Sequence, residues 1–484
     1  MVTLDVGSSS ARTLLFSLDG RQIEGFGSQV TYRAHTTADG GWEIDANELT
    51  AIAARALGDI CGQMRGKSAK PVAVAVDTFW HSVVGVDAGG KPTTALLHPF
   101  DTRSAGAAKE LAARVDNAAQ HKRTGCVIHP SYPPAKLLWL AETQPEALKK
   151  TARWMSAGEY LFLKFFGKAA TSTSMVSASG LWDQNANDYD AEILAALPVS
   201  RAQFAAVEGL DEASKGDVEW PELRGIPWFP ALGDGACDNV GSGCTRQERF
   251  ALMVGTSGAM RAVVEAEKIE IPDGLFCYRV DRKRFVLGGA LSNGGEVYAW
   301  MKRTLRLPED DEEIEKQLAA LEPGMHGLTV LPLFAGERST GWRADARAAM
   351  TGLGANTSAI EILHAALESV ALRFCNVYEI MKASLGTPRE VVASGSALLH
   401  SRVWTQMMAD ALGHAIISCV EREATSRGAA LLALERIGAI ADAGRAAAQC
   451  GDVIPVNAAN GNMYKDALER QRELYGKIFE VTHV

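Results

Sequence analysis

Two short segments rich in glycine and hydroxyl side chains have the residue types that bind phosphate. The first is Gly7-Ser8-Ser9-Ser10, followed by Arg12, and the second, half a chain length away, is Gly255-Thr256-Ser257, followed by Arg261. Glycine leaves backbone amides open to a ligand, and amides, hydroxyls and guanidinium groups all donate hydrogen bonds to phosphate oxygens. An ordinary polar hairpin has a similar composition. Because the pattern occurs twice, the sequence predicts a phosphate-facing loop in each half of the chain.

Transfer of a phosphoryl group also needs a divalent cation and a base for the attacking hydroxyl. Asp5 directly precedes the first hairpin and is placed to hold a hydrated Mg²⁺, a cation that keeps several waters. Asp234 lies between Gly233 and Gly235, so its carboxylate has little steric cover and suits a base that faces a cleft. The local sequence equally allows Asp234 to cap a helix. Asp238, one helical turn further on, is the competing candidate for the base.

Two further segments offer side chains for a polar substrate. His81 follows the apolar run of residues 71–77, and ligands of open α/β sheets gather at the carboxyl ends of strands. A single histidine after a strand is also often structural. Residues 124–132, which include His129, Ser131 and Tyr132, are polar and rich in turn formers. They line a sugar pocket or form an ordinary loop, and the local sequence favours neither.

The candidate phosphate, metal and substrate residues can meet only if strands end beside them and hold them in place. Residues 4–16 and 252–264 both show a strand, a tight turn and a second strand, and residues 71–77 are typical of a strand buried on both faces. Residues 389–396 predict a strand that ends in a glycine turn. Helices are predicted where apolar residues recur at helical spacing, as in 359–382 and 403–412. The mixture predicts an α/β fold.

Length and composition limit the possible classes. A chain of 484 residues exceeds what one hydrophobic core usually supports, so we expect two domains, 1–245 and 246–484. The net charge of −9 argues against a nucleic-acid surface, and no apolar run is long enough to span a membrane. Eight cysteines without a CxxC pair, and a strand pattern that starts at Val2 with no export sequence, predict reduced thiols and a cytoplasmic location.

At these residues the sequence resembles the FGGY family of carbohydrate kinases, over essentially the whole chain. Residues 5–12 look like the first phosphate hairpin of the family, and residues 255–258 look like the second. The segment Gly233-Asp234-Gly235 is similar to the one that carries the general base of the family. Further similar segments are 293–300, 336–342 and 393–400.

The resemblance implies an α/β fold of two ribonuclease-H-like domains, as in the actin-like ATPase superfamily, around a central cleft that binds ATP, Mg²⁺ and a sugar. It implies that Asp234 takes the proton of a sugar hydroxyl, while Asp5, from its place before the first hairpin, is the expected metal ligand. The residues implied to contact the substrate are Trp80, His81, His129, Ser131, Tyr132 and Asp234. The residues implied to bind ATP are Gly7, Ser8, Ser9, Ser10, Arg12, Gly255, Thr256, Ser257, Gly295, Gly395, Ser396 and His400.

Within this family the sequence looks most like the gluconate kinases, on residues 255–261 and on two substrate segments, His81-Ser82 and residues 124–126 with 129–130. We therefore expect ATP-dependent phosphorylation of the terminal hydroxyl of an open-chain sugar or sugar acid, with gluconate as first choice. Neither substrate segment contains the arginine or lysine that would pair with a carboxylate, and Pro99 and Ser172 depart from the family pattern. A kinase for a ketose such as xylulose or ribulose therefore stays open as an alternative.

Two other classes compete with a kinase. A nucleotide-gated interaction protein, like actin or the heat-shock ATPases, is one of them, but a chaperone would need a peptide-binding domain for which no length remains. A non-catalytic sugar-binding regulator is the other, and the intact Asp5, Asp234 and both hairpins argue against it. The expected partners are a sugar and ATP, with no nucleic acid and no membrane, and a homodimer stays open.

Overall fold

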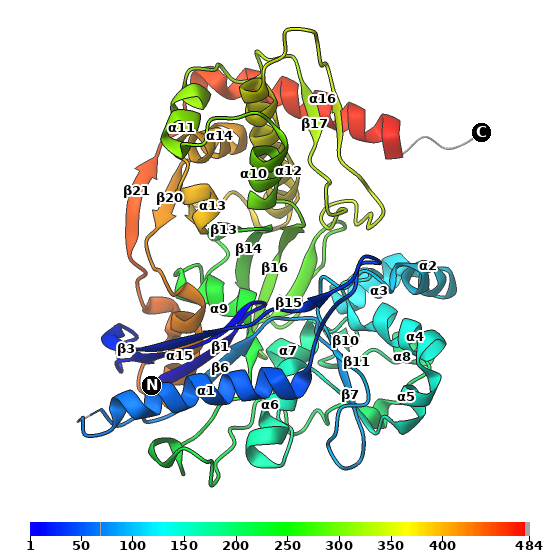
Figure 1. Ribbon diagram of the computed structural model, residues 1–484, viewed down its shortest axis with the longest axis vertical. Helices are drawn as coiled ribbons and strands as arrows, with labels where there is room; N and C mark the ends of the chain where they lie inside the picture. The colour runs from blue at the N-terminus through cyan, green and yellow to red at the C-terminus, as the bar shows by residue number, and fades with distance from the viewer. Residues whose placement is uncertain (68, 480–484) are drawn as a thin grey trace.

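Two β-sheets, one in each half of the chain, organise the fold (Figure 1). The computed structural model describes residues 1–67 and 69–479. The first sheet has the order β12 (Leu232–Gly233), β6 (Val74–Thr78), β1 (Val2–Val6), β2 (Ser10–Phe16), β3 (Gln22–Thr31). The second has the order β15 (Phe276–Arg279), β16 (Arg284–Leu291), β14 (Gly258–Glu265), β13 (Arg249–Val254), β19 (Glu390–Ser394), β20 (Ile416–Cys419), β21 (Cys450–Ile454).

The two sheets repeat one arrangement of strands. In the first, β1 pairs antiparallel with β2 and parallel with β6. In the second, β13 pairs antiparallel with β14 and parallel with β19. The two glycine-rich hairpins, β1–β2 and β13–β14, therefore occupy the same position in their sheets. This confirms the duplication predicted from the repeated hairpin, and it matches the expected pair of ribonuclease-H-like domains.

Helices from both halves cover the first sheet. Helix α1 (Ala46–Met64) packs against β2 and β3 with its apolar face, which includes Leu49, Leu57 and Ile60. Helix α15 (Ala424–Arg436) belongs to the C-terminal half, yet it packs against β1, β2 and β6 (Figure 1). Its residues 429–434 are buried in the same core as the first sheet. A segment near the C-terminus thus completes the hydrophobic core of the N-terminal sheet.

Helix α15 crosses α9 (Asp234–Gly241) in direct backbone contact. A Cβ atom on Gly241 would lie 1.7 Å from the carbonyl oxygen of Ala424, and one on Gly428 would lie 1.8 Å from that of Cys237. Real Cβ atoms do not approach other atoms so closely, so both positions require glycine for this crossing. The crossing holds the end of α9 against the start of α15.

The second sheet packs against the long helix α12 (Ala359–Leu385), with α10 (Gly295–Thr304), α14 (Arg402–Leu412) and α16 (Gly461–Phe479) around it. Helices α12 and α14 confirm the periodicity predicted for residues 359–382 and 403–412. The other helices are α2 (Ala105–Arg114), α3 (Asn117–Thr124), α4 (Pro133–Thr143), α5 (Pro145–Lys150), α6 (Ala157–Phe166), α7 (Thr173–Ser177), α8 (Ala191–Ala195), α11 (Asp311–Ala319) and α13 (Ser396–Leu399).

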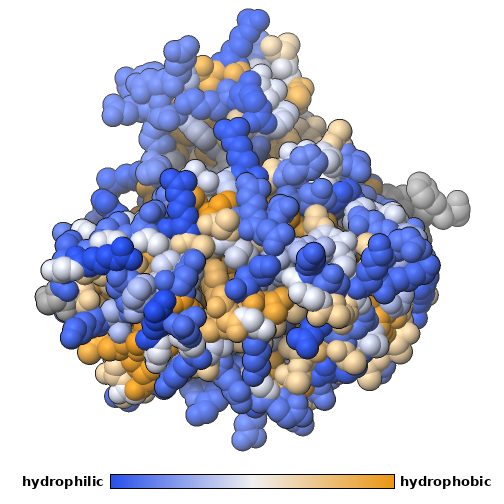
Figure 2. All heavy atoms as spheres, turned by 60° about the horizontal axis from the view of Figure 1, so that its bottom comes forward, coloured by the Kyte–Doolittle hydropathy of each residue, from blue (hydrophilic) through white to orange (hydrophobic). Residues whose placement is uncertain are grey.

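Short strands join the outer segments into small sheets. They are β4 (His35–Thr36), β5 (Trp42–Ile44), β7 (Val84–Val86), β8 (Leu96–Leu97), β9 (Arg153–Met155), β10 (Trp182–Asp183), β11 (Asp188–Tyr189), β17 (Thr329–Leu331) and β18 (Ala349–Thr351). On the face drawn in Figure 2, hydrophilic residues cover most of the surface and apolar residues form scattered patches. None of the helices in the described part of the chain has the length and apolarity needed to cross a bilayer.

Candidate active site

The carboxyl ends of three adjacent parallel strands bring three carboxylates together. Asp5 on β1 lies directly beside Asp77 on β6, and Asp77 in turn aligns with Leu232 on β12. Asp234 follows β12 and is the first residue of α9. The predicted metal and base residues, Asp5 and Asp234, thus lie at one edge of the sheet. Asp77 joins them there and was not predicted as a site residue.

Asp234 is free of ion pairs among the described residues, and its Oδ1 accepts only the N–H of Gly235, at 2.7 Å. The alternative that Asp234 caps a helix is wrong, because it is the first helical residue and Gly233 occupies the cap. The flanking glycines make room for Trp80, since a Cβ on Gly233 would lie 1.8 Å from its indole ring. Burial raises the pKa of Asp234 to about 6, while the charge of Arg261 opposes that rise.

Asp238, the competing candidate, is engaged in an ion pair. Its Oδ2 accepts a hydrogen bond from Nη1 of Arg261, on β14, at 3.1 Å. Asp238 lies one turn into α9, as its spacing from Asp234 predicted. Burial raises the pKa of Asp238 and the neighbouring Arg261 works against that rise. Of the two acids on α9, Asp234 is therefore the one with a carboxylate that no cationic side chain pairs with in the described chain.

Asp5 and Asp77 are a closely packed acid pair. Burial raises the pKa of both groups, and the adjacent charge of Asp5 raises that of Asp77 further. The two carboxyl groups lie close enough for each to affect the pKa of the other. Asp77 is fully buried, and within residues 1–67 and 69–479 neither of its carboxylate oxygens has a hydrogen-bond partner. The signal that could have identified it is its place at the end of an apolar strand run.

The first hairpin is a tight turn in which the N–H of Gly7 donates to the carbonyl of Ser10 at 3.0 Å. Arg12 lies opposite Asp5 across β1 and β2. Its guanidinium forms an ion pair with Glu423, which directly precedes α15. The expected phosphate-binding arginine therefore has a protein partner from the other half of the chain.

The second hairpin lies against two other predicted nucleotide segments. The N–H of Gly295 donates to the carbonyl of Gly255 at 2.7 Å, and the N–H of Glu296 donates to that of Thr256 at 3.1 Å. A Cβ on Gly395, which has a φ of +92°, would lie 2.4 Å from the carbonyl of Val254. A Cβ on Gly295 would likewise lie 2.7 Å from the carbonyl of Gly255. Gly295 and Gly395 are therefore both required for their segments to approach the second hairpin so closely. The exposed residues Ser396 and His400 lie at the start and the end of α13.

His81 and the segment 124–132 form one aromatic cluster. The ring of His81 lies 4.8 Å from that of Tyr132 and 5.2 Å from that of Tyr278. The hydroxyl groups of Tyr132 and Tyr278 are 2.6 Å apart. The ring of His129 lies 5.7 Å from that of Trp342, and its Nδ1 accepts the N–H of Ser131 at 3.1 Å. Tyr278 and Trp342 come from the C-terminal half. Trp342 ends the family-like segment 336–342, whereas no local sequence signal indicated Tyr278.

Two cations flank this cluster. Lys136, on α4, is fully buried and donates to the carbonyls of Ser131, at 2.9 Å, and His81, at 3.4 Å, so it ties the two segments together. Burial lowers the pKa of its ammonium to about 7. Burial also lowers the pKa of His81 and of His129 to about 3, and the nearby charges of Lys136 and Arg338 contribute to both shifts. Both imidazoles are therefore neutral near pH 7.

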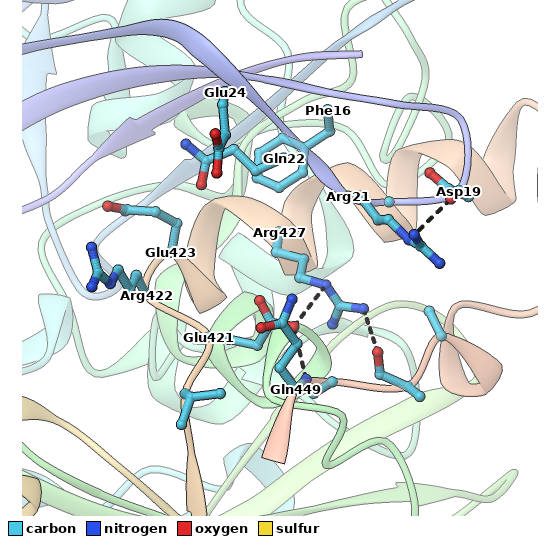
Figure 3. Close-up of a pocket in the computed structure, with 15 residues that line it drawn as sticks. Phe16, Asp19, Arg21, Gln22, Glu24, Glu421, Arg422, Glu423, Arg427 and Gln449 are labelled. Carbon is cyan, nitrogen blue, oxygen red and sulfur yellow. Dashed lines mark hydrogen bonds and ion pairs between the residues drawn. The ribbon is translucent and has the colours of Figure 1, made fainter. Parts of the chain in front are cut away.

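A cavity of about 1080 Å³ lies outside the carboxylate cluster. It is bordered by the β2–β3 turn and by the segment that leads into α15 (Figure 3). Arg427 reaches across its wall toward Glu421 and the carbonyl of Ala447, at 2.9 Å for the latter. Glu423, the partner of Arg12, also lines it. This ion pair links the wall of the cavity to Arg12 of the first hairpin.

Known proteins share both the sequence and the fold of this chain. The N-terminal domain of the FGGY family of carbohydrate kinases matches residues 1–219, and the C-terminal domain matches residues 250–435. A gluconokinase of Bacillus licheniformis is 26% identical over 455 residues, which cover 91% of this chain and 88% of the relative. A glycerol kinase of Nitratidesulfovibrio vulgaris is 28% identical over 458 residues, which cover 90% of each chain.

Solved structures share the fold at lower identity. A gluconate kinase from Lactobacillus acidophilus superposes with a TM-score of 0.89 at 22% identity, and covers 99% of this chain and 98% of that one. A xylulose kinase from Lactobacillus acidophilus gives a TM-score of 0.90 at 23% identity, with the same coverage. These confirm the expected pair of domains. Because the two family domains together match most of the sequence, the chain belongs to the FGGY family of carbohydrate kinases.

Proposed function

We propose that this kinase transfers the γ-phosphoryl group of ATP to the terminal hydroxyl of an open-chain sugar acid, with gluconate as first choice. The relatives named gluconokinase support this choice. The main observation in its support is the position of Arg338. Its positive charge is near enough to both His81 and His129 to lower the pKa of their imidazoles. Arg338 comes from the C-terminal half, and it supplies the cation for a carboxylate that the predicted substrate segments lack.

The substrate pocket combines this cation with neutral hydrogen-bonding groups. The neutral imidazoles of His81 and His129, with Ser131, Tyr132 and Trp80, would contact hydroxyl groups along the chain of the sugar. One guanidinium N–H of Arg338 already donates to the carbonyl of Leu291 at 2.9 Å, which fixes its orientation. An arginine held in this way can donate its remaining N–H groups to a carboxylate.

Asp234 would act as the general base. Its carboxylate has no ion-pair partner among the described residues, and with a pKa of about 6 it is mostly ionised at pH 7. It would orient the terminal hydroxyl for in-line attack and accept its proton. A base with a pKa near the working pH combines the correct protonation state with an effective transfer of the proton.

The two hairpins would hold the phosphates of ATP between the sheets. The proposed nucleotide contacts are Gly7, Ser8, Ser9, Ser10, Arg12, Gly255, Thr256, Ser257, Gly295, Gly395, Ser396 and His400. Asp5 would hold the Mg²⁺ that accompanies ATP, and the acid pair at this position fits a hard cation that prefers oxygen ligands. When bound, the metal neutralises charge on the phosphate groups. The amides of both hairpins would stabilise the transferred group.

We further propose that the domains divide near residue 245, into 1–245 and 246–484, and that the protein works in the cytoplasm. The division falls between the end of α9 and the start of β13. A ketose kinase remains the second candidate, because a xylulose kinase of Staphylococcus xylosus is 22% identical over 440 residues and neutral imidazoles suit uncharged sugars equally well.

The test compares kcat/KM for gluconate with that for D-xylulose, L-ribulose and glycerol at saturating Mg-ATP, by coupled measurement of ADP. We expect gluconate to be preferred. A ketopentose preferred by tenfold, about 1.4 kcal/mol of transition-state free energy, would overturn the choice of substrate. The variant Arg338→Gln should lower kcat/KM for gluconate more than for glucitol, which has the same carbon chain without the carboxylate. An equal loss of kcat/KM for gluconate and for glucitol would show that Arg338 does not bind the carboxylate.

A further inference from the structure

We infer that Asp77 is a second cation-binding carboxylate, which together with Asp5 holds the divalent metal that enters with ATP. This inference rests on the proposed function only in that it takes a metal–nucleotide complex as a substrate. It assigns to Asp77 a role that the sequence did not indicate.

The register of the first sheet directs Asp77 toward the metal position. Asp5 and Asp77 are aligned partners on the parallel strands β1 and β6. Aligned residues on neighbouring strands project their side chains from the same face of a sheet. Both residues lie at the carboxyl ends of their strands, where the first phosphate hairpin begins at Gly7. Asp77 is therefore placed beside the phosphates by the same strand order that places Asp5 there.

Burial makes a purely structural carboxylate at this position costly. Asp77 is 0% exposed, and no lysine, arginine or histidine of the described chain forms an ion pair with it. Neither of its carboxylate oxygens has a hydrogen-bond partner among the described residues. A buried acid without donors destabilises a fold unless a charge or a ligand compensates for it. A bound cation between the strand ends and the phosphates would provide that compensation.

The ligand set favours magnesium or manganese. The described residues contain one group of three side chains close enough to enclose a metal, His326, His364 and Glu368, and it includes neither Asp5 nor Asp77. Asp5 and Asp77 thus offer two protein carboxylates and no nitrogen or sulfur ligand. Mg²⁺ is typically held by one or two carboxylates, several waters and the phosphates of a substrate. The pair has the number and kind of ligands that this coordination requires.

The test measures metal binding apart from catalysis. Mn²⁺ replaces Mg²⁺, and free Mn²⁺ is followed by electron paramagnetic resonance as it binds to the full-length kinase with ADP. Removing a carboxylate that holds or orients a metal typically lowers affinity by about 10–100-fold. We expect a loss of about tenfold or more in Asp77→Asn, with unchanged affinity for metal-free ADP in calorimetry. If Asp77→Asn does not fold, Asp77→Ser, which is smaller, serves for the same measurement.

The control is Glu368→Gln, which removes a buried carboxylate from the group with His326 and His364. It should leave the Mn²⁺ affinity of the ADP complex unchanged. Mn²⁺ affinity within twofold of wild type in Asp77→Asn would overturn the inference, and so would an equal loss in Glu368→Gln. Normal Mn²⁺–ADP binding without phosphorylation of gluconate would instead overturn the proposed substrate and leave the role of Asp77 in place.

Discussion

Asp238 on α9 and Arg261 on β14 form an ion pair across the two halves of the chain, with 3.1 Å between Oδ2 and Nη1. Both side chains are largely buried, at 15% and 9% exposure. The pair has two consequences for the site. It occupies the carboxylate of Asp238, and it holds a positive charge near Asp234, where that charge favours the ionised form.

The first prediction separates the two acids of α9. Asp234→Asn keeps the shape of the side chain but cannot accept a proton, so kcat should fall by about 10²–10⁴-fold. Asp238→Asn should lower kcat far less, because its carboxylate holds Arg261 and does not face the hydroxyl. Steady-state kinetics on gluconate, with calorimetry of nucleotide binding as a check on folding, would measure both. A larger fall in kcat for Asp238→Asn than for Asp234→Asn would identify Asp238 as the base.

The second prediction concerns the dependence on pH. Burial raises the pKa of Asp234 to about 6, and a base must be ionised to act, so kcat/KM should fall as the pH drops below about 6. Arg261→Gln removes the charge that lowers this pKa, so the fall should begin at a higher pH. Profiles of kcat/KM from pH 5 to 9 for both proteins test this. If the acid limb of the kcat/KM profile in Arg261→Gln stays at the wild-type pH, or moves toward lower pH, the prediction is wrong.

The third prediction tests the crossing of α9 and α15. A Cβ on Gly428 would lie 1.8 Å from the carbonyl of Cys237, so Gly428→Ala must separate the helices. We expect a loss of about 1–3 kcal/mol in the free energy of unfolding, as for other overpacked sites. The matched control is Gly106→Ala on α2, where no atom lies within 4 Å of the added Cβ. Denaturant unfolding with equal losses for both variants would show that the crossing tolerates the methyl group.

The fourth prediction concerns Arg12 and its partner Glu423. If Arg12 binds a phosphate in the nucleotide complex, Glu423 competes for the same guanidinium. Arg12→Gln should therefore raise KM for ATP, by about tenfold for one lost charged hydrogen bond, while Glu423→Gln should not raise it. Initial rates at varied ATP and saturating gluconate would measure both effects. Equal increases would mean that Arg12 acts only through its ion pair with Glu423.

Local sequence determined the parts of this protein that depend on short-range chemistry. The hairpins at Gly7 and Gly255 were predictable because glycine and serine between apolar runs favour a tight turn between strands. Helix α12 was predictable from its apolar spacing, and Asp234 stood out because glycines flank it. These features arise from backbone preferences and periodicity over a few residues, which the sequence displays directly.

The tertiary structure alone decided which distant residues meet. Asp77 lies beside Asp5 because β6 pairs with β1 in one particular register, and a slip by one residue would turn its side chain to the other face. Arg338 and Tyr278 reach His81 only because the second sheet packs against the substrate segments. Helix α15 packs into the first core against β1, β2 and β6 and crosses α9 there. Such contacts depend on strand order and on the close fit of whole helices, and no short stretch of sequence encodes them.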